Sequence, residues 1–153
     1  MIVTVVRPED DLARLVAEIN SACWDAANAM DAYDVDSLAG YLSLQGTVFV
    51  TCHDDADGQR RLLGMASARI EVKPYGGERW LYVDEVDVCA DQRQRGAGGA
   101  LMNRLLAIAR ETGCEEVWLG TEPDNQAANA LYRSLHPADV AEVVGYTFAL
   151  AHP

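Results

Sequence analysis

The chain has 153 residues, of which 50% are hydrophobic and 24% charged, and its formal net charge is −12. This length and balance are typical of one globular domain, so we expect a single domain over residues 1–153. No run approaches the roughly 18 apolar residues of a membrane span, and the N-terminus lacks a secretory signal pattern. These absences favour a cytoplasmic protein without a membrane partner.

The charge distribution also narrows the class of partner. Residues 1–59 hold eleven acidic side chains and two basic ones. Such a surface is a poor match for nucleic acid, whereas it attracts cationic small molecules. The cysteines form no CxxC pair and the histidines have no partner at ligand spacing, so we expect no metal site.

The first half of the chain predicts a strand, two helices and three further strands. Ile2–Val6 is a β-branched run, and Arg7–Asp10 brings proline and acids to the start of a helix with apolar residues at helical spacing. A second helix, capped by Asp34 or Asp36, runs to Leu44. The polar connection at residues 25–33 either borders a substrate cleft or is an inert surface segment. An antiparallel meander is expected from strands at Thr47–Cys52, Leu62–Val72 and Trp80–Val88.

The second half alternates between helices and strands. These elements are expected at Gly98–Glu111 (helix), Glu115–Gly120 (strand), about Asp124–Leu135 (helix) and about Val143–Leu150 (strand). The order β-α-α-β-β-β-α-β-α-β predicts an α/β (α+β) fold, in which a mixed sheet has helices on both faces.

The strand Trp80–Val88 changes phase in its middle. Its apolar residues occupy odd positions through Val83 and even positions from Val86 onward. A slip of this kind either flips the strand or is absorbed by a β-bulge, and we predict a bulge near Glu85–Asp87. An extended ligand with amide groups could pair with the backbone groups that a bulge frees. An edge strand with a solvated face is the alternative.

A turn rich in arginine and glycine follows this strand and opens the next helix. Unpaired N–H groups at a helix N-terminus bind phosphate, glycine allows close approach, and Arg93 and Arg95 add positive charge. The dinucleotide fingerprint is excluded because it needs glycine at position 101, which is Leu101. The P-loop is excluded because no Gly-Lys-Ser/Thr follows.

The pattern Arg93-x-x-Gly96-x-Gly98, between an acidic strand and an amphipathic helix, resembles the (Arg/Gln)-x-x-Gly-x-(Gly/Ala) signature of the GNAT superfamily of N-acetyltransferases. The resemblance implies a GNAT fold with a bulged, splayed central strand pair and acetyl-CoA as cosubstrate. The pyrophosphate would lie on the turn, and the pantetheine arm would pair like a strand with residues 86–88. The residues implied in cofactor binding are Val86, Asp87, Val88, Arg93, Gln94, Arg95, Gly96, Ala97, Gly98, Gly99, Asn125 and Tyr132.

The last predicted helix carries Asn125, Asn129 and Tyr132 on one face. This spacing resembles the second GNAT motif, which implies that Tyr132 holds the CoA sulfur and protonates the departing thiolate. The alternative for Tyr132 is a core aromatic with its hydroxyl at the surface. Where the family often has Gly-Phe after this helix, the chain has His136-Pro137, so the helix end is expected to differ locally.

Acetyl transfer to an amine needs a proton acceptor and an oxyanion donor, but no covalent nucleophile. Carboxylates beside the two central strands are the candidates, and we expect Glu85 to be the base, with Glu122 second. Backbone N–H groups of residues 86–88 are the expected oxyanion donors. Acids that are only solvated strand ends are the alternative. The expected ligands of the substrate ammonium are Asp84, Glu85, Glu122 and Asp124, with Asp87 as a further candidate.

Several stretches are similar to the aminoglycoside 3-N-acetyltransferases, among them the strands at Thr47–Cys52 and Tyr82–Val88 and the helix around Tyr132. This similarity implies a polycationic sugar as acceptor, and hence a role in antibiotic resistance. Acetylation of a protein α-amine, a lysine or a polyamine stays open, as does a CoA-binding module without turnover. Homodimers are common among proteins of this kind, so a homodimer also stays open.

Overall fold

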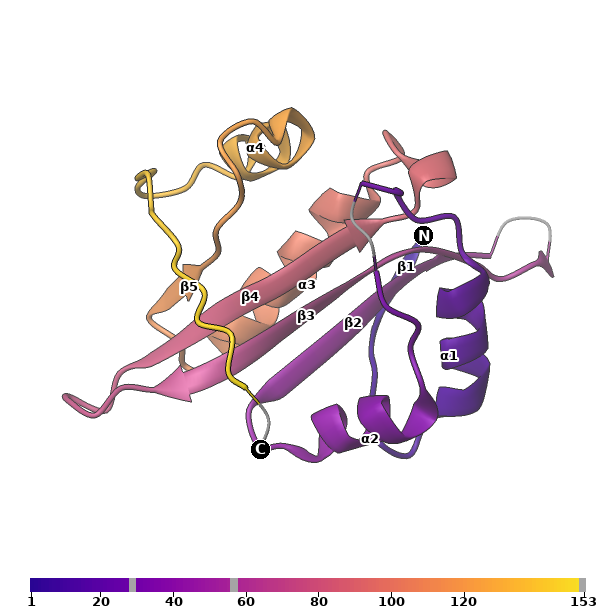
Figure 1. Cartoon of the computed structure of the whole chain (residues 1–153), viewed down its shortest axis with the longest axis horizontal. Helices are drawn as coiled ribbons and strands as arrows, with labels where there is room; N and C mark the ends of the chain where they lie inside the picture. Colours follow the sequence, from indigo (N-terminus) through magenta and orange to yellow (C-terminus); the bar gives the residue numbers. More distant parts are fainter. Residues whose placement is uncertain (28–29, 56–57, 152–153) are drawn as a thin grey trace. The chain divides into compact units, whose positions relative to one another are not determined.

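The computed structural model describes residues 1–27, 30–55 and 58–151, which form two compact units (Figure 1). The first unit is Met1–Leu119, and the second begins at Gly120. The second unit contains the helix α4 (Gln126–Ser134). The first unit contains β1 (Ile2–Val5), α1 (Leu12–Ser21), α2 (Val35–Ser43), β2 (Thr47–Asp54), β3 (Arg61–Val72), β4 (Arg79–Val88), the 3-10 turn η2 (Ala90–Gln92), α3 (Ala97–Glu111) and β5 (Glu116–Trp118).

The strands of the first unit form one mixed sheet in the order β1-β2-β3-β4-β5. The first three pairings are antiparallel, and β4 pairs with β5 in parallel. A parallel pair needs a crossover, which here is the α3 segment between β4 and β5. The predicted α/β fold with a mixed sheet is therefore confirmed.

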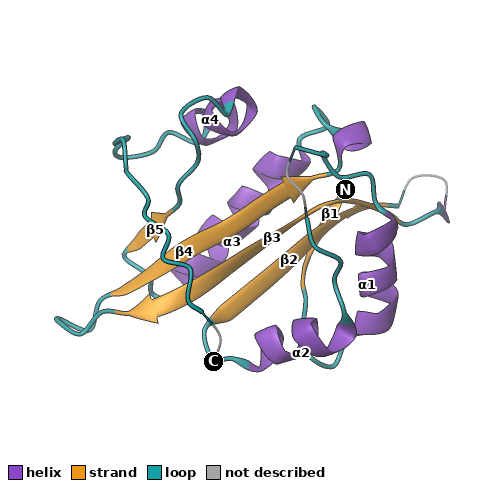
Figure 2. Cartoon of the chain, in the orientation of Figure 1, coloured by secondary structure: helices purple, strands orange, loops and turns teal. Residues whose placement is uncertain are grey.

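Helices cover both faces of this sheet, and the strand residues show which face each helix covers. Apolar side chains of α1, α2, β2 and β3 form one core cluster, in which Phe49 and Met65 point toward α1 and α2. On the other face, a Cβ atom at Gly64 would meet the Leu101 side chain of α3 at 3.2 Å. Figure 2 shows α3 crossing behind the sheet. Because neighbouring strand residues alternate faces, every position of β3 and β4 can be assigned to the α1/α2 face or to the α3 face.

Aspartate caps set the starts of the first two helices. The Asp34 side chain accepts a hydrogen bond from the Ser37 N–H, as one of the two predicted caps of α2. In α1 the prediction was wrong by about one turn. Arg7–Asp10 forms a turn closed by the Arg7 N–H and the Asp10 carboxylate at 2.7 Å, and the helix begins at Leu12 because Asp11 caps the Arg14 N–H at 3.0 Å.

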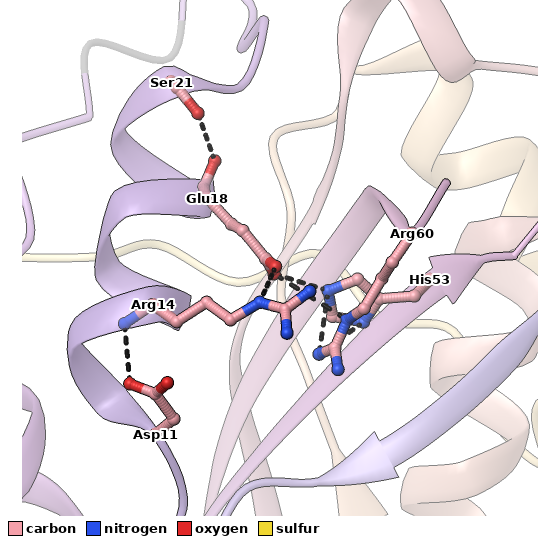
Figure 3. A network of polar contacts seen from close by, with 6 residues as sticks. All are labelled: Asp11, Arg14, Glu18, Ser21, His53 and Arg60. Atoms are coloured by element: carbon pink, nitrogen blue, oxygen red, sulfur yellow. Dashed lines mark hydrogen bonds and ion pairs between the residues drawn. The ribbon is translucent and has the colours of Figure 1, made fainter. Parts of the chain in front are cut away.

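A polar network around the buried His53 joins α1 to the end of β2 (Figure 3). The His53 Nε2 atom lies 2.9 Å from Glu18 Oε2, and the Arg60 guanidinium lies beside the imidazole. Burial lowers the pKa of His53, although the hydrogen bond to Glu18 opposes this shift. Burial alone would raise the pKa of Glu18, but hydrogen bonds from His53 and Arg14 outweigh it, and the pKa is lowered. The network fixes α1 against the sheet.

The last predicted strand, at about Val143–Leu150, is not formed. In the described part of the second unit, residues 138–151 have neither helix nor strand. Their large apolar side chains are exposed, with Tyr146 at 82% and Phe148 at 84%. A strand exists only through hydrogen bonds to a neighbouring strand, and the second unit supplies no such ladder among its described residues.

Candidate active site

A bulge interrupts β4 within the predicted acidic segment. Ser67 of β3 pairs with Glu85, whereas its neighbour Ala68 pairs with Val83, so Asp84 is the extra residue. The predicted bulge is thus present, although it lies one residue before the range Glu85–Asp87. The extra residue keeps apolar side chains on the α3 face on both sides of the bulge, which explains why the apolar pattern changes from odd to even positions.

The bulge places two carboxylates on the α1/α2 face. Glu85 pairs with Ser67, which pairs with Phe49. Asp87 pairs with Met65, and both Phe49 and Met65 belong to the core beneath α1 and α2. Directly opposed residues share a face of the sheet, so Glu85 and Asp87 lie on the α1/α2 face. Without the bulge both would point into the apolar layer under α3.

The edge of β4 that faces β5 is open beyond Tyr82. β5 is short and pairs only with Trp80, Leu81 and Tyr82 of β4. In the described part of the first unit, no strand pairs with residues 83–88 on that side. The two strands thus separate where the bulge begins, and the backbone groups of Val86 and Val88 face this edge without a partner strand in the described part of the first unit, whereas those of Asp87 face β3.

The turn between β4 and α3 has the geometry of an anion site. Gln94 and Gly96 take positive φ angles of 62° and 85°. Left-handed residues alternating with ordinary ones turn successive N–H groups toward one concavity, and the positive end of the α3 dipole adds to it. Residues 93 and 94 form a turn, and the N–H groups of Ala97, Gly98 and Gly99 in the first turn of α3 have no acceptor within the helix. A non-glycine residue at positive φ, as at Gln94, is typical of a functional turn.

Both arginines of this turn are paired with acids. Arg93 Nη2 lies 2.5 Å from the carboxylate of Asp25, which belongs to the connection between α1 and α2. Arg95 contacts Asp54 at the end of β2 and donates to Gln92 Oε1 at 2.6 Å. A second contact, from the Ala90 N–H to the Cys23 carbonyl at 2.6 Å, ties the same connection to η2. Of the connection at residues 25–33, residues 28 and 29 lie outside the described residues.

Tyr33, from the same connection, interacts electrostatically with the carboxylates of Glu85 and Asp87 on β4. Tyr33 is held by two hydrogen bonds with the Asn20 side chain, at 2.8 and 2.9 Å, and its ring packs on Phe49 with centroids 6.2 Å apart. Burial, with the charges of Glu85 and Asp87, raises the pKa of Tyr33 to about 12. Burial, with the charge of Glu85, raises the pKa of Asp87 to about 6. The three side chains therefore form one electrostatic group on the α1/α2 face.

The carboxylate of Asp84 forms an ion pair with Arg69. Arg69 Nε donates to its carboxylate at 3.2 Å. Burial raises the pKa of Asp84, and the attraction of Arg69 opposes the rise without cancelling it. As an ion-paired bulge residue it is a weaker candidate than Glu85 or Asp87 for binding an ammonium.

The remaining predicted residues lie in the second unit. Asn125 is the N-cap of α4, and its side chain accepts from the Ala128 N–H at 3.1 Å. The Asn129 amide donates to the Glu122 carbonyl at 3.0 Å, which holds the segment before the helix. Tyr132 lies within α4, and Asp124 lies just before its cap. His136 takes a φ of 54° after the helix, where glycine is the usual residue, so this helix end carries a conformational cost.

Sequence reasoning missed three contributors to the site. Tyr33 was treated as part of a polar connection, and Asp25 and Asp54 were not linked to the arginines. Only the phase slip in β4 held a usable signal, because it already placed Glu85 and Asp87 two residues apart on one face. The pairings of the arginines depend on contacts between segments far apart in the sequence.

Known proteins share both the sequence pattern and the fold. Residues 13–136 match the acetyltransferase (GNAT) family. Mycothiol acetyltransferase of Clavibacter sepedonicus is 40% identical over 92 residues, which are 60% of this chain but 28% of that enzyme. L-2,4-diaminobutyric acid acetyltransferase of Shouchella clausii (strain KSM-K16) is 29% identical over 133 residues, or 87% of this chain and 72% of that enzyme.

A crystal structure of an aminoglycoside acetyltransferase from an uncultured soil metagenomic sample, in complex with sisomicin, superposes with a TM-score of 0.82. It is 17% identical, and the match covers 98% of this chain and 96% of that one. At this identity the likeness shows a shared fold. In the described residues, no helix is long and apolar enough to cross a membrane.

Proposed function

The chain belongs to the GNAT family of acetyltransferases, and from this premise we propose that it transfers the acetyl group of acetyl-CoA to a primary amine. The observation that carries the proposal is the combination of the open β4 edge with the donor-rich turn at the start of α3. An open strand edge can bind extended amide groups such as those of the pantetheine arm. A donor-rich turn can bind an anion such as the pyrophosphate, and acyl-CoA contains both groups.

Acetyl-CoA would occupy these two features as a cosubstrate. N–H groups of residues 94–99 would bind the pyrophosphate, with Arg93 and Arg95 adding charge once they leave their acid partners. The pantetheine amides would pair with the backbone of Val86–Val88. One N–H group of that edge would then face the thioester oxygen and stabilise the oxyanion.

The acceptor amine would approach from the α1/α2 face. The carboxylates of Glu85 and Asp87 lie there, and both attract an ammonium group. A carboxylate accepts the ammonium proton, the amine attacks the thioester carbonyl, and the thiolate leaves as the amide forms. Glu85 is the first candidate for the base on sequence grounds. Tyr132 and Glu122 keep their proposed roles as acid and second base.

We propose a cationic small molecule as the acceptor, with an aminoglycoside first. The net charge of −12 and the carboxylates of β4 support a cation. The fold shared with an aminoglycoside acetyltransferase supports that choice among cations. A free diamino acid is the second candidate, because the relative with the widest coverage named above acts on L-2,4-diaminobutyric acid. Peptide α-amines, lysine and polyamines are the remaining alternatives.

The test is release of free thiol from acetyl-CoA with a panel of amines: sisomicin, L-2,4-diaminobutyrate, spermidine and a peptide with an N-terminal alanine. Turnover of sisomicin at a kcat/KM at least about tenfold above the others supports the aminoglycoside. Preference for another amine corrects the acceptor and keeps the acetyl transfer. Binding of acetyl-CoA in calorimetry with no thiol released from any amine contradicts an acetyltransferase and indicates a CoA-binding module.

A further inference from the structure

We infer that Asp87, rather than Glu85, accepts the proton of the acceptor ammonium, and that Glu85 holds the ammonium in position. This assignment rests on the proposed acetyl transfer. From the sequence, Asp87 was expected to pair with the pantetheine arm and to be a further ligand of the ammonium, but not to be the base.

The geometry of β4 places the Asp87 side chain between the two backbone positions of the open edge. Backbone N–H and C=O groups of a strand lie in the plane of the sheet, whereas side chains stand perpendicular to it. Asp87 pairs with Met65 of β3, so the backbone groups that β4 presents at its open edge are those of Val86 and Val88, on either side of Asp87, while the Asp87 side chain stands on the α1/α2 face. A thioester paired with Val86 and Val88 and an amine on that face would therefore meet beside the Asp87 side chain.

The surroundings of the two carboxylates differ. Glu85 is exposed, whereas Asp87 is half-buried, opposite the buried Met65. The groups that face Asp87 are Glu85 on its own strand and Tyr33 from the α1–α2 connection, and the buried thiol of Cys89 lies two residues further along the chain. Among the described residues, no cationic side chain contributes to the pKa of Asp87.

These surroundings suit a base that works near neutral pH. With a pKa of about 6, the Asp87 carboxylate is mostly ionised at pH 7 yet binds a proton more readily than an ordinary aspartate. Tyr33, with a pKa of about 12, stays protonated at this pH and adds no charge. Glu85 is exposed, and its charge attracts a cation approaching from solvent.

The proton balance of the step is complete. One ammonium proton moves to the Asp87 carboxylate, and the freed electron pair of the nitrogen forms the C–N bond. The C–S bond breaks, and its electron pair leaves with sulfur. The second nitrogen proton goes to the thiolate, and Asp87 returns its proton to solvent.

The two assignments predict different pH profiles of kcat/KM with the best amine of the panel. We expect the wild-type profile to fall below a pKa near 6. Asp87→Asn should lower kcat by about 10²- to 10³-fold, with little change in the KM for the amine. Glu85→Gln should raise the KM for the amine, keep kcat within about tenfold, and move the acidic limb to lower pH, because its charge no longer raises the pKa of Asp87.

The reverse pattern would overturn the assignment. Loss of kcat in Glu85→Gln, with Asp87→Asn only shifting the limb, makes Glu85 the base. Glu116→Gln, an exposed acid of β5, is the matched control and should leave the profile unchanged. Carboxyl NMR of the free protein gives a readout independent of turnover: a titration near pH 6 should vanish in Asp87→Asn and move down in Glu85→Gln. Wild-type protein that releases no thiol with any amine contradicts the acetyl transfer itself. The NMR titration still tests whether the charge of Glu85 raises the pKa of Asp87.

Discussion

Burial disfavours the charged form of Asp87, so removing this charge should stabilise the protein at neutral pH. In the folded protein the pKa of this carboxyl rises from its ordinary value of 3.8 to about 6, mainly through burial and then through Glu85. The charged form is therefore disfavoured by folding. Stability is fully retained below the unfolded pKa, falls as the pH rises from about 4 to 6, and stays reduced at pH 7.

Asparagine has nearly the same shape and no charge, so Asp87→Asn should be more stable than the wild type at pH 7. At about 1.36 kcal/mol per pKa unit the shift amounts to ~3 kcal/mol. Solvent screening of a part-exposed side chain reduces the expected gain to ~1–2 kcal/mol. For a chain of this length that is a rise in Tm of about 2–4 °C per kcal/mol.

Thermal unfolding of both proteins at pH 7 and pH 4 measures the effect. The gain should be present at pH 7 and almost absent at pH 4, where the wild-type carboxyl is already mostly protonated. Glu116→Gln is the control, because it removes an exposed charge from the same sheet and should change little at either pH. An Asp87→Asn variant that is equally stable or less stable than the wild type at pH 7 would refute the reasoning, and with it the electrostatic basis for Asp87 as the base.

Three further substitutions test other parts of the site. Gly98→Trp places a large side chain in the first turn of α3, so the Kd for acetyl-CoA should rise at least about tenfold by calorimetry, and an unchanged Kd would contradict the pyrophosphate site. Gly64→Ala puts a Cβ atom 2.5 Å from the Asp87 carbonyl, so it should destabilise the protein by ~1–3 kcal/mol and weaken acetyl-CoA binding; Gly40→Ala, whose Cβ meets nothing within 4 Å, is the matched control and should not destabilise. His53→Gln removes a histidine kept neutral by burial, so urea unfolding should show a smaller loss of stability between pH 7 and pH 5 than in the wild type, and an equal loss would argue against that neutral state.

How far the sequence predicts the site depends on whether the signal is local. The change of phase between Val83 and Val86 is a property of one strand, and it was enough to predict a bulge. The exact extra residue, Asp84, depends on which residue of β3 lies opposite, which the pattern of β4 alone does not contain. The GNAT fold followed from the order of elements together with the arginine-glycine turn, and the family match confirms it.

Predictions failed where long-range contacts decide the structure. Alternating apolar residues such as Tyr146 and Phe148 have strand propensity, but propensity without a hydrogen-bonding partner forms no strand. Tyr33 joined the site through the Asn20 side chain and the Phe49 ring, thirteen and sixteen positions away in the sequence. No local pattern marks a tyrosine in a polar connection as part of a carboxylate site.

If acetyl-CoA binds at this turn as proposed, the ion pairs of Arg93 with Asp25 and of Arg95 with Asp54 would make its entry an exchange of anions. A pyrophosphate that takes these guanidinium groups must first displace two carboxylates, so its affinity is the difference between two sets of charge pairs. Added salt weakens both sets, and the affinity should vary less steeply with ionic strength than it would for two unpaired arginines. Because Asp25 belongs to the same connection as Tyr33, an occupied turn also releases one restraint on the segment beside the acceptor face.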